Sequence, residues 1–148
     1  MSKTSENFKV IGDVELVVTA PDGSVKDRVE VKNLVVSGGK TWIASRMASA
    51  TDAVMSHMAI GTGTVTPSLG NTALVLENAR VALSSTTASF NTVTFSAFFP
   101  AGTGTGQITE AGIFNAAALG TLLCRTTFDG VNKDVLDSLT INWTITII

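Results

Sequence analysis

The chain has 148 residues, of which 45% are hydrophobic and 15% charged, and its formal net charge is −2 at pH 7. This length is typical of one domain with a sizeable core. The small negative charge argues against a general nucleic-acid-binding protein, which needs basic residues to hold phosphates. The single cysteine, Cys124, excludes an internal disulfide and a cysteine-rich zinc site. The chain opens without a basic and apolar leader and has no apolar run of about 18 residues, so we expect neither a secretion signal nor a membrane span.

The N-terminal part of the sequence predicts a polar arm followed by a β-hairpin. Residues 1–7 are polar, and we expect an arm that is either mobile or ordered only against a partner. From 8 to 19 and again from 25 to 36, apolar and polar residues alternate with the period of two that a half-buried strand requires. The Pro-Asp-Gly sequence at 21–23 is a turn signal between these strands, because Pro presets φ and Gly tolerates positive φ.

The next part of the chain predicts one helix and then shorter strands. The glycine pair at 38–39 is expected to end the preceding strand, and 40–50 has apolar residues near helical spacing. This segment predicts a short helix that plugs one end of a sheet or covers an edge. Residues 53–60 predict a short buried strand, 61–72 a loop rich in Gly, Thr and Pro, and 80–89 a strand of weak alternation.

The second half of the chain predicts further strands separated by loops. Apolar and polar residues alternate strictly over 92–99, and a glycine–threonine loop at 101–106 separates this strand from a short one at 108–114. Another strand is predicted at 121–128. The polar stretch 129–134 is expected to be a turn that leads into the last strand.

The C-terminal stretch 139–148 is the clearest strand in the sequence. Every second residue from Leu139 to Ile147 is apolar, Thr and Asn stand between them, and Trp143 is a large central anchor. About eight strands with frequent turn signals predict an all-β fold, an antiparallel β-sandwich that is jelly-roll-like and has one short helix. We expect residues 8–148 to form a single domain, and the choice between a jelly roll and a simpler Greek key stays open.

None of the candidate chemical motifs predicts an enzyme. The glycine-rich segments 61–63 and 102–106 resemble phosphate loops, but a phosphate loop opens into a helix, whereas the second of them leads into a strand. His57 has no acidic residue nearby in sequence to orient it and is interpreted as a packed or interface histidine. Cys124 lies in an apolar segment and is interpreted as buried and inert. We therefore expect no catalytic residue, no cofactor, no metal and no small-molecule substrate.

Glu110 and Arg125 stand alone, each inside an apolar predicted strand. An isolated charge in such a strand is costly unless it is paired. One hypothesis is that the two residues lie on neighbouring strands and pair with each other. The alternative is that each points to solvent at a sheet edge.

Five segments of the sequence resemble a set of small structural proteins of tailed bacteriophages, over roughly residues 31–148. The segments are MSHMAIGTG (55–63), ALVLENARVAL (73–83), NTVTFSAFFPAGTGTGQITEAGIFNA (91–116), GTLLCRTTF (120–128) and DSLTINWTITII (137–148). Similar segments occur in capsid cement (decoration) proteins and in tail fibre or collar proteins. The resemblance implies a virion structural protein and no catalytic residues.

The choice between head and tail depends on the rest of the chain. It has no heptads for a coiled-coil stalk and no internal repeats, and it stops with the last strand of the predicted sandwich. We therefore favour a capsid cement protein that binds the outside of the shell and bridges major capsid protein subunits. It would be made in the bacterial host cytoplasm and end on the capsid surface of the virion. The alternative is a tail fibre, collar or adaptor protein. A glycan hydrolase or a carbohydrate-binding module is disfavoured, since no carboxylate pair is evident and the aromatic residues fall mostly on predicted inner faces.

The expected partners are the major capsid protein and further copies of the chain, as a dimer or another homo-oligomer, with no membrane and no nucleic acid. The arm, residues 1–7, and the loops 61–72 and 100–107 are the candidate contact surfaces. The two Thr/Gly loops offer backbone hydrogen-bond groups and small side chains that allow close approach of a partner. The candidate residues are Ser2, Lys3, Phe8, Thr62, Thr64, Pro67, Thr103 and Thr105. The alternative for both loops is that they are merely corners of the sandwich.

Overall fold

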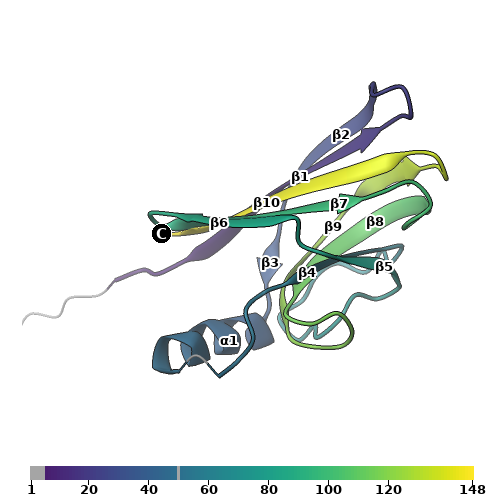
Figure 1. Ribbon diagram of the computed structural model, residues 1–148. Helices are drawn as coiled ribbons and strands as arrows, with labels where there is room; N and C mark the ends of the chain where they lie inside the picture. Colours follow the sequence, from purple (N-terminus) through teal and green to yellow (C-terminus); the bar gives the residue numbers. More distant parts are fainter. Residues whose placement is uncertain (1–5, 50) are drawn as a thin grey trace, which may run out of the picture.

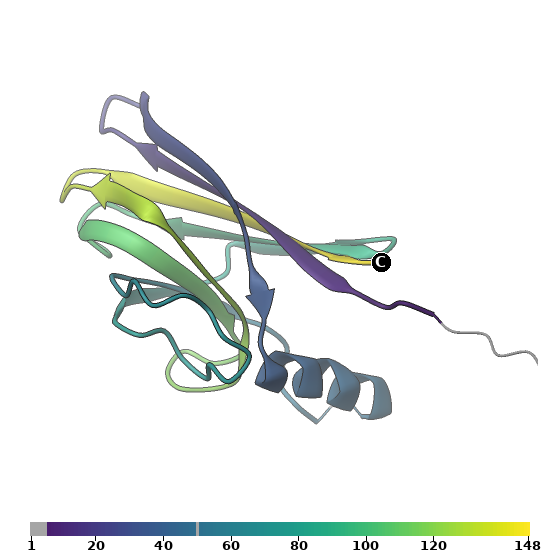
Figure 2. The ribbon, with the colours of Figure 1, turned by 180° about the vertical axis from the view of Figure 1, so that it is seen from behind.

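The computed structural model describes residues 6–49 and 51–148 and shows two five-stranded antiparallel sheets that face each other (Figure 1). The first sheet has the strand order β2-β1-β10-β7-β6 and the second β3-β9-β8-β4-β5. Helix α1 (Ser37–Ala48) lies below one end of the first sheet, as the view from behind also shows (Figure 2). The predicted antiparallel sandwich with one short helix is therefore confirmed.

The ten strands in the described part of the chain divide evenly between the sheets. The first sheet contains β1 (Val10–Thr19), β2 (Val25–Lys32), β6 (Ser85–Ser89), β7 (Thr92–Phe99) and β10 (Ser138–Ile147). The second sheet contains β3 (Leu34–Val35), β4 (His57–Gly61), β5 (Glu77–Ala82), β8 (Gly106–Phe114) and β9 (Leu122–Lys133). No helix in the described residues is long and apolar enough to cross a membrane.

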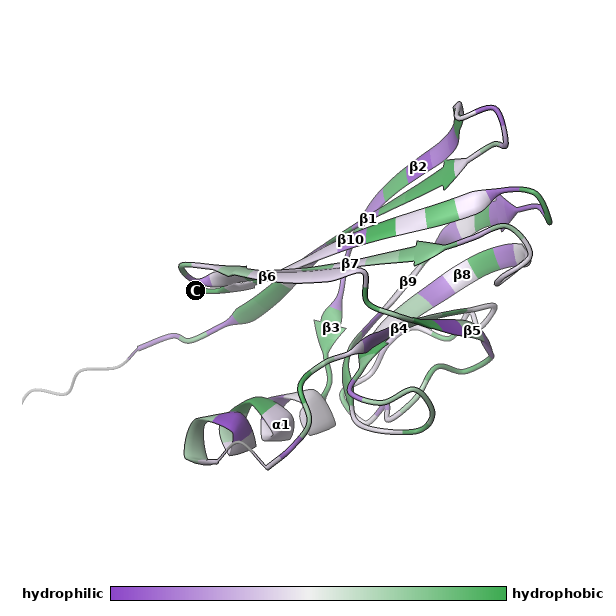
Figure 3. Cartoon of the chain, in the orientation of Figure 1, coloured by the Kyte–Doolittle hydropathy of each residue, from purple (hydrophilic) through white to green (hydrophobic). Residues whose placement is uncertain are grey.

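Strand β10 is the central strand of the first sheet and carries the middle of the core. Trp143 lies opposite Val14 of β1 and Phe95 of β7 in the antiparallel registers. The apolar residues of β10 that face the second sheet are fully or nearly fully buried: Leu139, Ile141, Trp143 and Ile145. Figure 3 shows this alternation as bands along the strand. The predicted strand with one buried face is therefore confirmed, and the cause is the period of two.

The predicted strand at 25–36 is two strands, and they belong to different sheets. It breaks at Asn33, so that β2 stays in the first sheet while β3 pairs with β9 in the second. The helix also begins earlier than predicted, because Ser37 and the glycine pair belong to it. Gly39 is buried, and a Cβ atom at this position would overlap the carbonyl oxygen of Leu123. Gly39 therefore lets α1 pack closely on β9, whereas a Cβ atom at Gly38 would meet no neighbouring atom.

Two other predicted boundaries are wrong. Residues 80–89 form parts of β5 and β6, which lie in opposite sheets because the chain crosses over at Leu83 and Ser84. The polar stretch 129–134 is not a turn, because β9 continues through it to Lys133. The pairing of β9 with β8 is irregular between Thr127 and Val131, and this irregularity accommodates the polar residues within the strand.

Candidate functional site: two anchored loops and an apolar groove

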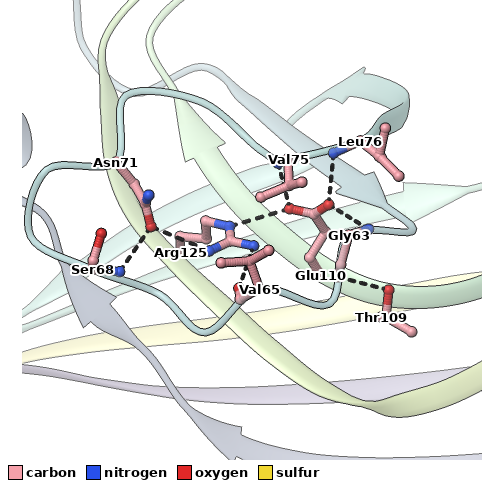
Figure 4. A network of polar contacts seen from close by, with 9 residues as sticks. All are labelled: Gly63, Val65, Ser68, Asn71, Val75, Leu76, Thr109, Glu110 and Arg125. Atoms are coloured by element: carbon pink, nitrogen blue, oxygen red, sulfur yellow. Dashed lines mark hydrogen bonds and ion pairs between the residues drawn. The ribbon is translucent and has the colours of Figure 1, made fainter.

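Glu110 and Arg125 lie on the neighbouring strands β8 and β9 and contact each other. Nε of Arg125 donates to Oε1 of Glu110 at 3.1 Å, and both side chains are fully buried. Neither residue points to solvent, because β8 and β9 are inner strands of their sheet and the loop 62–76 covers them. Figure 4 shows the pair beneath this loop.

The carboxylate of Glu110 also binds the backbone of the loop 62–76. It accepts hydrogen bonds from the backbone N–H groups of Gly63 at 2.6 Å, Val75 at 2.9 Å and Leu76 at 2.9 Å. A Cβ atom at Gly63 would overlap this carboxylate, so a glycine is needed for the close approach. With these three donors and the guanidinium, the buried charge is fully solvated by the protein.

The guanidinium of Arg125 binds two further positions of the same loop. Nη2 donates to the carbonyl oxygen of Val65 at 2.8 Å, and Nη1 donates to Oδ1 of Asn71 at 3.1 Å. Oδ1 of Asn71 also accepts from the backbone N–H of Ser68 at 2.8 Å. The loop contains no helix or strand, and the contacts with the ion pair beneath it help to fix its shape.

The anchored loop exposes apolar as well as hydroxyl side chains. Thr62 and Thr64, both predicted contact residues, are exposed, and Pro67 is half-buried. Val65 is 59% exposed and Leu69 48% exposed. These two residues were not among the predicted contact residues, which are small or hydroxyl-bearing for the most part, although apolar residues inside a Gly/Thr/Pro loop are a visible signal.

Of the second predicted contact loop, 100–107, residues 106 and 107 belong to β8, and the remaining loop 100–105 is held by a buried lysine. Lys133 is fully buried, and its Nζ donates to the carbonyl oxygen of Pro100 at 2.9 Å. Burial lowers the pKa of Lys133 below its ordinary value. Thr105 is exposed and Thr103 half-buried. The loop leads directly into β8, so it lacks the helix that a phosphate-binding glycine loop requires.

The N-terminal candidates are only partly within the described residues. Ser2 and Lys3 lie outside them. Phe8 is 65% exposed, next to Lys9, which exchanges backbone hydrogen bonds with Ile148. This is the opposite end of the first sheet from the loop 100–105, so the structure does not bring the predicted contact residues onto one surface.

His57 contacts a serine hydroxyl, and Cys124 lies in the core. Nδ1 of the half-buried His57 is 2.8 Å from Oγ of Ser56. Cys124 is fully buried, and burial raises the pKa of its thiol well above the ordinary value, which disfavours the reactive thiolate. Among residues 6–49 and 51–148, no group of three or more His, Cys, Asp or Glu side chains could hold a metal ion.

A groove of about 640 Å³ lies between the end of the first sheet and helix α1. Its lining is almost entirely apolar and comes from seven parts of the chain: β1, α1, the segment before β4, β6, β7, β9 and β10. The lining includes Trp42 and Met47 from α1, Val54 and Met55 before β4, Ala88 from β6 and Ile145 from β10. No sequence pattern predicted this groove, because segments far apart in the sequence form it.

Comparison with known proteins identifies the family. The family described as phage tail-collar fibre protein, N-terminal, matches residues 29–147. No curated protein and no solved structure matches the chain. The family match favours the tail-fibre alternative over the predicted capsid cement protein. The prediction of a cement protein rested mainly on the lack of coiled-coil heptads and internal repeats, and the family match outweighs it. The chain belongs to the phage tail-collar fibre protein family, as a structural protein of the bacteriophage virion.

Proposed function

We propose that this chain attaches a collar fibre to the phage tail by binding other tail proteins, and that it catalyses no reaction. The observation that carries the proposal is the family match over residues 29–147. The described residues support it, since their buried ionisable groups hold loops in place rather than line a polar cleft. Glu110 and Arg125 are the clearest case.

The loop 62–76 is the surface that we propose for the tail partner. Val65 and Leu69 expose apolar area there, and Thr62 and Thr64 add hydroxyl groups at the rim. A partly apolar centre with a polar rim is the usual composition of a protein–protein interface. The anchoring by Glu110 keeps the loop in one shape before binding, which lowers the entropy lost on association.

Separated heads and tails test the location of the protein. An antibody against the chain should label purified tails and leave tail-free heads unlabelled in electron micrographs. Labelled heads with unlabelled tails would support the capsid cement hypothesis and reject the proposal. Virions that lack the protein should lose adsorption to the host while their heads keep normal heat resistance. Heads that burst more readily on heating would also reject it.

A loop variant tests the proposed surface. Val65→Ser together with Leu69→Ser removes exposed apolar area, so incorporation into tails should fall by about tenfold or more. The matched control is Val25→Ser, because Val25 is similarly exposed but lies at the start of β2. Circular dichroism should show both variants folded. Equal incorporation of the loop variant and the control would reject this surface.

A further inference from the structure

The loop 115–120, which connects β8 to β9, exposes an apolar residue in a disfavoured backbone conformation. Leu119 is 86% exposed and has a φ of 55°. Left-handed backbone costs energy for a residue with a Cβ atom. The neighbouring Ala117 and Ala118 are exposed as well. Backbone strain at an exposed apolar residue indicates a role other than folding, because neither feature stabilises the free chain.

Arg80 of β5 holds this loop in place. Its Nη1 donates to the carbonyl oxygens of Ala116 at 3.0 Å and Leu119 at 2.8 Å, and its Nε and Nη2 donate to the carboxylate of Glu77 at 3.1 Å and 2.7 Å. The guanidinium also lies over the ring of Phe114, with Cζ 3.7 Å from the ring centroid. Only 7% of the Arg80 side chain is exposed. Because one guanidinium binds two carbonyl groups of the loop, Arg80 fixes the position in which Leu119 is presented.

The loop 115–120 and the loop 62–76 rest on one small apolar cluster, which is separate from the main core. The members of this cluster are Val36, Ala59, Leu74, Phe114 and Leu122. Leu74 belongs to the loop 62–76, while Phe114 and Leu122 flank the loop 115–120. Both loops lie on the side of the second sheet that faces away from the first (Figures 1 and 2). Leu119 therefore adjoins the surface that is proposed for the tail partner.

This side of the molecule has little exposed charge. Residues 58–76 and 111–124 contain no Asp, Glu, Lys or Arg. The charged side chains beneath the loops, Arg80, Glu110 and Arg125, are buried or nearly buried and form ion pairs. Strands β1 and β2 of the first sheet, in contrast, expose several charged side chains. A charged partner surface would lose hydration on the two loops without gaining a counter-charge, which is costly.

We propose that the loops 62–76 and 115–120 together bind one uncharged, apolar surface of another tail protein, and that Arg80 positions Leu119 for this contact. The inference rests on the proposed function and states the chemistry of the partner. Charged residues are depleted at the centre of protein–protein interfaces, as they are on these two loops. Both loops are held by side chains beneath them, so little conformational entropy is lost on association.

Two matched variants test the contact of Leu119. Leu119→Asn removes the apolar side chain but suits left-handed backbone, so the variant should melt at the same temperature as the wild type or higher. Its amount in purified tails should fall by about tenfold or more when it replaces the native protein during phage assembly. Phe90→Asn is the control, because Phe90 is also fully exposed with a φ of 52° but lies in the β6–β7 turn of the first sheet. Tails should carry the normal amount of this control.

The outcomes separate this inference from the proposed function. Normal incorporation of Leu119→Asn, together with loss of the variant at Val65 and Leu69, would overturn the inference and leave the proposed function in place. Equal losses for Leu119→Asn and Phe90→Asn would also overturn it. Antibody labelling of heads instead of tails would reject the proposed function itself.

A pair of opposite charges tests the chemistry of the partner. Ala118→Lys and Ala118→Glu should each lower incorporation by about tenfold or more, because either charge would be buried against an uncharged surface. Thr87→Lys and Thr87→Glu are the controls, since Thr87 is exposed on β6 of the first sheet, and both should be incorporated normally. If one charge at Ala118 is tolerated and the other is not, the partner surface is charged and the inference is wrong.

A double variant tests whether Arg80 acts through Leu119. Arg80→Lys keeps the charge but lacks the fork that binds two carbonyl groups, so backbone amides of the loop 115–120 should exchange hydrogen faster and incorporation should fall. A purely structural role would add its loss to that of Leu119→Asn, whereas a positioning role should not. Incorporation of the double variant should therefore match that of Leu119→Asn alone. Losses that multiply in the double variant would refute the positioning role.

Discussion

The buried pair of Glu110 and Arg125 predicts a strong energetic coupling. Arg125→Met leaves the carboxylate with its three backbone donors, and Glu110→Gln leaves the guanidinium with Val65 and Asn71. Breaking one partner of a buried ion pair costs about 3–5 kcal/mol of stability. The hydrogen bonds that remain place the cost of each single variant at the lower end of this range, about 3 kcal/mol. The double variant removes both charges and should cost about as much as one single variant, so the coupling energy should be about 2–3 kcal/mol.

Urea unfolding followed by tryptophan fluorescence measures this coupling, because Trp143 is fully buried in the core. The same cycle on Arg28 and Glu15, which form an ion pair at 3.0 Å on the surface, is the matched control. Its coupling should be much smaller, because water screens exposed charges. Losses that simply add for the buried pair would refute the reasoning that the two charges depend on each other.

Three further predictions concern other anchoring residues. The pKa of Asp137 is lowered from 3.8, chiefly by the hydrogen bond from Lys26. The stabilisation by this carboxylate is therefore present above the ordinary pKa and is lost as pH falls through the folded-state pKa. Asp137→Asn should flatten the acid side of a plot of urea midpoint against pH. Gly63→Ala should lower the free energy of unfolding by about 2–4 kcal/mol because its Cβ would displace the carboxylate beneath it, whereas Gly70→Ala, which meets no neighbouring atom, should change the urea midpoint little. Lys133→Met should stay within about 1 kcal/mol of the wild type in the same assay, because removing a buried charge offsets the lost hydrogen bond.

The strands were predictable where one face alone is buried. In β10, apolar and polar residues alternate around Trp143 because only one face of the strand is buried, while its edges pair with β1 and β7. The crossover at Leu83 and Ser84 was not predictable in the same way, because neither Gly nor Pro marks it. Hydrogen bonds from Leu83 to Ser56 and from Ser84 to Ser96 divide the segment between the sheets, and these contacts are distant in sequence.

In the candidate site, the charged pair and the position of the two loops were predictable, but the contacts that hold the loops were not. An isolated Glu110 and an isolated Arg125 inside apolar strands suggest a pairing, because burial without a partner is costly. The loop 62–76 that covers the pair is held through Gly63 and Asn71. Its sequence has no periodic pattern, so these contacts could not be predicted. The groove needs α1, β6, β10 and the segment before β4 together, so no single stretch of the sequence predicts it.

A buried ion pair, rather than an apolar cluster, is needed beneath the loop 62–76 because of the backbone that it holds. The loop turns the N–H groups of Gly63, Val75 and Leu76 inward, and an apolar residue in place of Glu110 would leave all three without an acceptor. A carboxylate accepts all of them at once, and Arg125 then balances its charge while binding a carbonyl on the other side of the loop. The same two side chains therefore neutralise each other and determine the shape of the surface that the loop presents.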